Sequence, residues 1–167
     1  MCMDGDVVDA VDVGGLRIAF QREGRGPPLV LLHGFVDDGV GTWGYQLEAL
    51  SDAFTGIAWG LSRSRPFISR ARIVPVGRLC GPSFGFLRAL DLAHPYVAGL
   101  SFGAVLALEL FRRHGEVPQR LILASAYAGW AGSFRSDIVE ERLRRSLEVS
   151  RLPAAEFVAA MLPSMFS

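Results

Sequence analysis

The sequence contains no lysine, and all seventeen of its basic residues are arginine. Seventeen aspartates and glutamates balance them, so the formal net charge at pH 7 is +0. A neutral chain has no overall electrostatic attraction to nucleic acid or to an anionic membrane surface. We therefore expect neither a nucleic acid nor a membrane as a partner.

Cysteine and long apolar runs are also scarce. The two cysteines, Cys2 and Cys80, are too few for the disulfide framework of a secreted domain. Asp4, Asp6 and Asp9 stand where a secretory signal peptide needs positive charge. No apolar stretch approaches the ~18 residues that span a bilayer. These absences lead us to expect a cytoplasmic protein.

Hydrophobic patterning predicts an α/β protein with a mostly parallel sheet. Two short runs around Gly14 and Gly15 are typical of an N-terminal β-hairpin. Further strands are expected at residues 29–32, 57–59, 96–99 and 121–124, the first and the last two of them buried. Helices are expected at 43–50, 84–90, 104–114, 137–147 and 153–162, and the helix at 104–114 is apolar nearly all round. Alternating strands and helices favour parallel pairing.

Residues 60–83 follow neither the strand period nor the helix period. This segment holds five arginines and no acidic residue, so it carries +5 and the rest of the chain −5. We expect it to be irregular. A basic loop that binds an anion is one interpretation, and a stretch read in a shifted frame is another.

The strongest motif is Gly99-Leu100-Ser101-Phe102-Gly103, a G-x-S-x-G between an expected strand and an expected helix. On such a tight turn the serine is strained, and the small flanking residues let the chain pass without a clash. The hydroxyl is then held above the sheet, at a helix N-terminus whose N–H groups can stabilise an oxyanion. Ser101 is therefore a candidate nucleophile. The alternative is a turn that contains a serine by chance.

A second motif, His33-Gly34-Phe35, follows the buried strand at 29–32. Loops that leave the carboxyl ends of central strands are where open α/β sheets bind ligands. The N–H groups of Phe35 and Phe102 could converge there on one oxygen. For His33, we favour a role in holding the loop by hydrogen bonds over a role as general base.

Together these motifs resemble the α/β-hydrolase superfamily, in its serine-nucleophile branch. The resemblance implies that Ser101 is the nucleophile, that Phe35 and Phe102 form the oxyanion hole, and that His33, Gly34, Gly99 and Gly103 support the loop and the elbow. It implies hydrolysis of a small-molecule ester, lactone or amide, with no cofactor and no metal. A serine at the elbow argues against the dehalogenase and epoxide hydrolase branches, which use aspartate. Residues 1–128 would form a partial core and residues 129–167 the start of a helical cap.

The sequence departs from that family in its catalytic partners. The family order is nucleophile, acid, histidine, yet the one histidine after Ser101 is His114, about 20 Å away at the far end of the expected helix. His94 is expected at the opposite edge of the sheet. Asp137 is a candidate acid, although it also fits a helix cap.

We therefore expect a serine hydrolase that is C-terminally truncated and inactive as this chain, with its last strands missing. The alternative is a degenerate, non-catalytic or binding protein of the same fold. The strand at 121–124 would then be an uncovered apolar edge that invites self-association. Residues 60–83 fall where the family has an acidic, glycine-rich loop. The segment has about the length that the family needs at this place, but its sequence is rich in arginine and free of acidic residues. This combination favours the shifted-frame interpretation.

Overall fold

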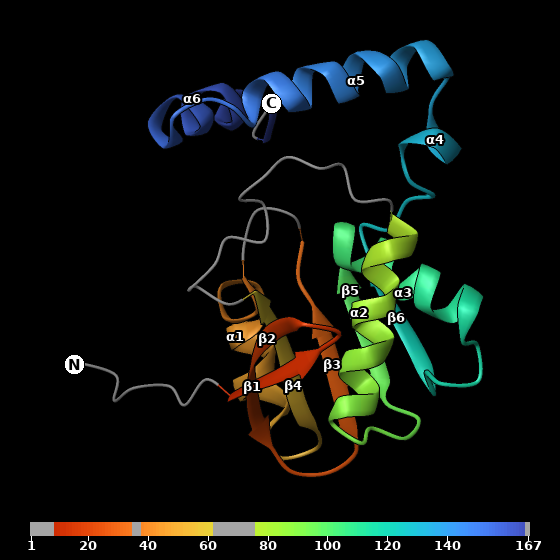
Figure 1. Ribbon diagram of the computed structural model, residues 1–167. Coiled ribbons are helices and arrows are strands. Elements are labelled where there is room, and N and C mark those ends of the chain that lie inside the picture. The colour runs from red at the N-terminus through yellow and green to blue at the C-terminus, as the bar shows by residue number, and fades with distance from the viewer. Residues whose placement is uncertain (1–8, 35–37, 62–75, 166–167) are drawn as a thin grey trace, which may run out of the picture. The chain divides into compact units, whose positions relative to one another are not determined.

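The computed structural model describes residues 9–34, 38–61 and 76–165. The contacts within the chain divide it into two compact units, Met1–Tyr127 and Ala128–Ser167. The first unit carries the sheet and the second is helical, and each is described by itself (Figure 1).

A six-stranded sheet of order β1-β2-β4-β3-β5-β6 forms the first unit. The strands β1 and β2 pair antiparallel, as do β2 and β4, and the other three pairings are parallel. This mixed α/β sheet confirms the predicted fold class. Its elements are β1 (Asp9–Val13), β2 (Leu16–Gly24), β3 (Pro28–Leu32), α1 (Gly39–Leu50), β4 (Thr55–Leu61), α2 (Val76–Ala89), β5 (Tyr96–Leu100), α3 (Phe102–Arg113) and β6 (Arg120–Ala124).

The central strands are buried on both faces, because helices pack against each side of the sheet. Successive residues of β3 point into different cores: Val30 and Leu32 into one, Leu29 and Leu31 into the other. The larger core lies between the sheet and the helices α2 and α3, and the smaller lies beneath α1. A continuous apolar run is what such a strand requires.

The predicted N-terminal hairpin is present. Its two-residue turn consists of Gly14 at φ 56° and Gly15 at φ 81°. Positive φ at both turn positions matches the right-handed twist of the flanking strands, and glycine adopts it without steric cost.

The expectation for residues 60–83 was wrong at both ends of the segment. Strand β4 continues to Leu61, and α2 begins at Val76; residues 62–75 lie outside the described part of the chain. Three glycines and a proline in the sequence of α2 give it a poor intrinsic helix preference. Phe86 is 0% exposed and Leu87 2%, so tertiary packing outweighs that preference.

The apolar run at 121–124 predicted a buried strand, which is wrong, whereas the expected loss of later strands predicted an uncovered edge, which the sheet order confirms. In the described sheet β6 is an edge strand, and Ile122 is 56% exposed. The neighbouring helix α3 buries one face only, because Phe111 is 50% exposed. A sequence of apolar residues identifies a strand but not what covers it.

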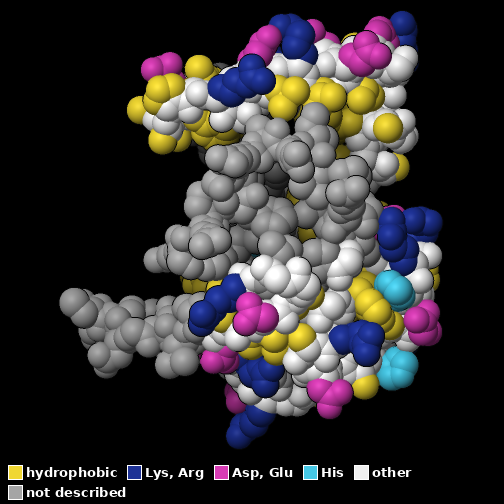
Figure 2. Space-filling view, viewed as in Figure 1, with side chains coloured by type: hydrophobic (Ala, Val, Ile, Leu, Met, Phe, Trp, Pro, Cys, Tyr) yellow, Lys and Arg dark blue, Asp and Glu magenta, His cyan; other side chains and the backbone are white. Residues whose placement is uncertain are grey.

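The second unit contains α4 (Trp130–Ser133), α5 (Ser136–Val149) and α6 (Ala154–Met165). Asp137 does not cap α5: the N-cap is Arg135, and the guanidinium of Arg135 contacts the carboxylate of Asp137 at 3.2 Å. Hydrophobic side chains reach the surface of this unit (Figure 2), among them Phe134, Ile138 and Val158. Within the described residues, no helix combines the length and apolar composition that crossing a bilayer requires.

Candidate active site

Ser101 occupies the turn between β5 and α3, one residue before the helix begins. Its backbone has φ 52° and ψ −110°, a conformation that side-chain-bearing residues rarely adopt. Strain of this kind costs about 1–3 kcal/mol and is concentrated at functional sites. The structure therefore places Ser101 where the G-x-S-x-G motif predicts it, on a sharp turn at the carboxyl edge of the sheet.

Two glycines of the motif are required by close packing. A Cβ atom on Gly99 would lie 2.5 Å from the carbonyl carbon of Gly103 and 2.6 Å from the nitrogen of Ala104. A Cβ atom on Gly103 would lie 2.7 Å from the carbonyl oxygen of His33 and closer still to that of Leu32. Any side chain at either position would push α3 away from β3 and β5. The motif is thus an elbow in which strand and helix cross at backbone distance.

The His33–Gly34 loop lies beside Ser101. A Cβ atom on Gly34 would be 3.9 Å from the Cβ of Ser101 and 3.7 Å from the carbonyl oxygen of Leu100. The Nδ1 of His33 lies 2.6 Å from the carbonyl oxygen of Gly34. Because that oxygen can only accept, Nδ1 carries the proton and donates it. His33 thus makes a hydrogen bond within the loop.

Only one of the two expected oxyanion donors, Phe102, lies within the described residues. Phe102 is the first residue of α3, so its N–H lies at the helix N-terminus. Phe35 lies outside the described residues.

A feature that the sequence did not indicate ties the elbow to β6. The N–H of Ser101 donates to the carbonyl oxygen of Ala124 at 2.9 Å. The next residue, Ser125, also has a positive φ of 51°. Strained serines therefore stand at the carboxyl ends of two adjacent strands. The signal that could have suggested this is the serine that directly follows the apolar run 121–124.

Neither of the other two histidines adjoins Ser101 in the fold. His114 is the C-cap of α3, at the end of the helix opposite to Ser101, and its ring stacks on Phe84 with the centroids 3.8 Å apart. A helix of this length separates its ends by about 18 Å. His94 precedes β5 and so lies at the other edge of the sheet.

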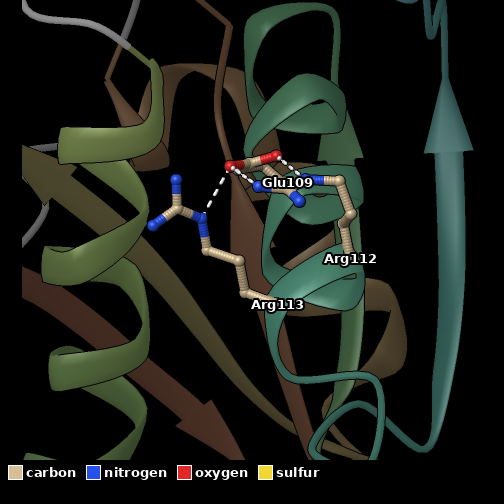
Figure 3. Close-up of polar contacts among 3 residues, drawn as sticks. All are labelled: Glu109, Arg112 and Arg113. Carbon is tan, nitrogen blue, oxygen red and sulfur yellow. Dashed lines mark hydrogen bonds and ion pairs between the residues drawn. The ribbon is translucent and has the colours of Figure 1, made fainter.

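The carboxylate nearest in sequence to the elbow, Glu109, is held by two arginines of its own helix (Figure 3). Arg112 Nε lies 2.7 Å from Oε2, and Arg113 Nε lies 2.6 Å from Oε1. These hydrogen bonds lower the pKa of Glu109 to about 2 from an ordinary 4.5. Glu109 is thus ion-paired with arginines of α3 itself, about two helical turns beyond Ser101. Across the described residues, no cluster of three or more histidine, cysteine and acidic side chains could hold a metal ion.

Comparison with known proteins gives relatives of low identity, and no family model matches the chain. Over 112 residues it is 30% identical to the dihydrolipoyllysine-residue acetyltransferase component of the acetoin cleaving system of Cupriavidus necator, covering 66% of this chain and 29% of that protein. Over 120 residues it is 22% identical to the pyrrolizixenacetamide deacetylase of Xenorhabdus hominickii, and the match covers 72% of this chain and 45% of that protein. The chain spans less than half the length of either relative.

Solved structures give a firmer comparison. A protein of Nostoc sp. PCC 7120 assigned to the alpha/beta hydrolases superimposes with a TM-score of 0.66 at 23% identity, covering 87% of this chain and 52% of that one. Epoxide hydrolase VrEH1 from Vigna radiata superimposes with a TM-score of 0.66 at 20% identity, and the match covers 81% of this chain and 45% of that one. Sheet order, elbow and superposition agree: this chain has the α/β-hydrolase fold.

Proposed function

We propose that the chain is the nucleophile-bearing part of a serine hydrolase that cleaves esters, lactones or amides through an acyl-enzyme on Ser101. The observation that carries this proposal is the strained backbone of Ser101 between two glycines that tolerate no side chain. A serine held in that conformation at a helix N-terminus is suited to nucleophilic attack. One relative is named a deacetylase, and deacetylation is also the cleavage of an acyl group.

In the proposed reaction the Oγ of Ser101 attacks the acyl carbonyl carbon, and a base accepts the hydroxyl proton. The carbonyl oxygen becomes an oxyanion, which the N–H groups of Phe102 and Phe35 stabilise. Collapse of the tetrahedral intermediate expels the alcohol or amine, which takes a proton from the conjugate acid of the base. Water then hydrolyses the acyl-enzyme by the same steps.

The base and its acid partner would come from sequence outside residues 1–167. His114 and His94 do not adjoin the elbow, and the hydrogen bond from Nδ1 of His33 to the Gly34 carbonyl fits a role in holding the loop. General-base assistance alone contributes about 10²–10⁴-fold in rate. We therefore propose that residues 1–167 alone are inactive.

The second candidate is a non-catalytic protein that keeps the fold without the reaction. It is favoured by the same placement of the histidines. The two candidates differ in whether Ser101 can be acylated once a base is provided.

Imidazole in solution supplies that base. We expect residues 1–167 to hydrolyse p-nitrophenyl acetate no faster than the Ser101→Ala variant without imidazole. With imidazole, we expect Ser101 to become acetylated, as detected by peptide mass mapping. The Ser125→Ala variant is the matched control, since Ser125 has the same positive φ and stands on the adjacent strand.

Two outcomes would contradict the proposal in different ways. A serine-dependent rate without imidazole would show that the chain holds its own base, with His33 the first residue to test. Failure of imidazole to produce acetyl-Ser101, or equal acetylation of other serines, would favour the non-catalytic candidate.

A further inference from the structure

A second candidate site lies at the edge of the sheet opposite to Ser101. A hollow of about 310 Å³ is formed by the end of α2, the loop that precedes β5 and the loop that precedes β6. The five residues of β5 separate this edge from the Ser101 turn by about 16 Å. The hollow is therefore distinct from the proposed active site.

The floor of the hollow is apolar and its position is fixed. Phe84, Leu87, Leu92 and Val117 line it, and Leu87 is 2% exposed. The two loops are joined by His94, whose Nδ1 lies 3.0 Å from the carbonyl oxygen of Glu116. The volume is at the lower end of the range for small-molecule sites, about 300–1,000 Å³.

Charges of both signs stand at its rim. Arg88, in the last turn of α2, and Glu116, in the loop that precedes β6, are exposed residues that line the hollow. Within the described part of the chain neither of these side chains has an ion-pair partner, although both line the same hollow. On the face shown in Figure 2, side chains of both charge signs and of histidine border hydrophobic ones on the sheet unit.

The ends of two helices add to this arrangement. Both α2, which ends at Ala89, and α3, which ends at Arg113, terminate at this edge of the sheet. Helix C-termini favour positive charge, through the partial negative charge of their last carbonyl groups. These helix ends therefore favour an ammonium group in the hollow, whereas only the guanidinium of Arg88 attracts a carboxylate there.

We propose that this hollow binds a small zwitterion with an apolar side chain, of the chemical class of the aliphatic amino acids. The carboxylate pairs with Arg88, the ammonium group pairs with Glu116, and the side chain lies on the Phe84 and Leu92 surface. A simple fatty acid uses only the arginine and meets the repulsion of Glu116. An alkylamine likewise uses only the glutamate and meets the repulsion of Arg88.

Binding of three matched probes to residues 1–167 tests the assignment by ligand-observed NMR. The probes are L-leucine, 4-methylpentanoate and 3-methylbutylamine, which share an isobutyl group and differ in their charges. We expect leucine to bind most tightly. Arg88→Gln and Glu116→Gln should each weaken leucine binding by about two- to fivefold, the loss expected for one exposed ion pair.

Arg17→Gln is the control variant, because Arg17 is an exposed arginine of β2, pairs in register with Asp12 of β1 and does not line the hollow. It should leave leucine binding unchanged. Each singly charged probe should respond to the variant that removes its own partner and not weaken with the other. The proposal is overturned by equal binding of the three probes, by no saturable leucine binding in the millimolar range, or by Arg88→Gln behaving like Arg17→Gln.

Discussion

Gly103 lies directly against the carbonyl group of Leu32, where the first turn of α3 passes the end of β3. The two residues are far apart in the sequence and meet at the candidate active site. Their contact sets how closely the Ser101 elbow approaches the His33–Gly34 loop. The glycine of the motif is therefore a packing requirement of the fold as well as part of the nucleophile turn.

Substitution of Gly103 by alanine should destabilise the first unit. The added Cβ would overlap backbone atoms of Leu32 and His33, which cannot move aside as a flexible side chain can. Overpacking of this kind costs about 1–3 kcal/mol. Urea unfolding measures the loss.

The control for that experiment is Gly44→Ala in α1, where a Cβ atom meets nothing within 4 Å. Alanine in a helix is favoured over glycine by about 0.5–1 kcal/mol, so Gly44→Ala should raise the free energy of unfolding. If the two alanine variants have the same free energy of unfolding, Gly103 does not lie in tight contact with the backbone of Leu32 and His33.

Replacing Ser101 by glycine should stabilise the protein, in contrast to replacing it by alanine. Glycine removes the strain of φ 52°, which costs about 1–3 kcal/mol. Part of that gain is lost to the greater freedom of glycine in the unfolded chain, about 0.4–1 kcal/mol. We expect Ser101→Gly to be about 1 kcal/mol more stable than Ser101→Ala by urea unfolding. Equal stabilities would mean that the elbow is not strained.

The sequence predicted the parts of the fold that local chemistry determines. Glycines with positive φ specify the hairpin turn at Gly14 and Gly15, and apolar runs specify β3 and β5. The G-x-S-x-G spacing located the elbow, because a backbone crossing leaves room for no side chain at Gly99 or Gly103.

Features that depend on distant partners were missed. The start of α2 at Val76 was not predicted, because burial of Phe86 and Leu87 against other elements outweighs a glycine-rich sequence. The apolar run alone predicted a buried β6, since Ile122 has the same apolar character whether or not another element covers it; the uncovered edge was predicted only from the expected loss of later strands. The hydrogen bond from Ser101 to Ala124 depends on strand order, which periodicity does not reveal.

The exposed edge of β6 should cause the chain to self-associate. This strand presents an apolar surface at Ile122 and has no lysine, proline or bulge to block pairing with another strand. We expect concentration-dependent association in sedimentation velocity, and we expect Ile122→Lys to reduce it. Ile138→Lys, at an exposed apolar site on α5, is the control. A monodisperse monomer at all concentrations, or an equal effect of both lysines, would refute the role of this edge.

The stability that Glu109 contributes should disappear in acid. Its pKa is lowered from 4.5 to about 2 in the folded chain by hydrogen bonds from Arg112 and Arg113. A carboxylate with a depressed folded pKa stabilises the protein fully above its unfolded pKa, and the contribution is lost as pH falls through the folded value. The stability difference between wild type and Glu109→Gln should thus be constant near neutral pH and shrink from about pH 4.5 to about pH 2.

A matched comparison separates this ion pair from general acid unfolding. The double variant Arg112→Gln and Arg113→Gln removes the donors and leaves the carboxylate, whose pKa should then return toward its ordinary value. In that background Glu109→Gln should no longer alter the pH dependence of unfolding between pH 4.5 and pH 2. If it still does, groups other than these two arginines hold the Glu109 carboxylate in its charged form.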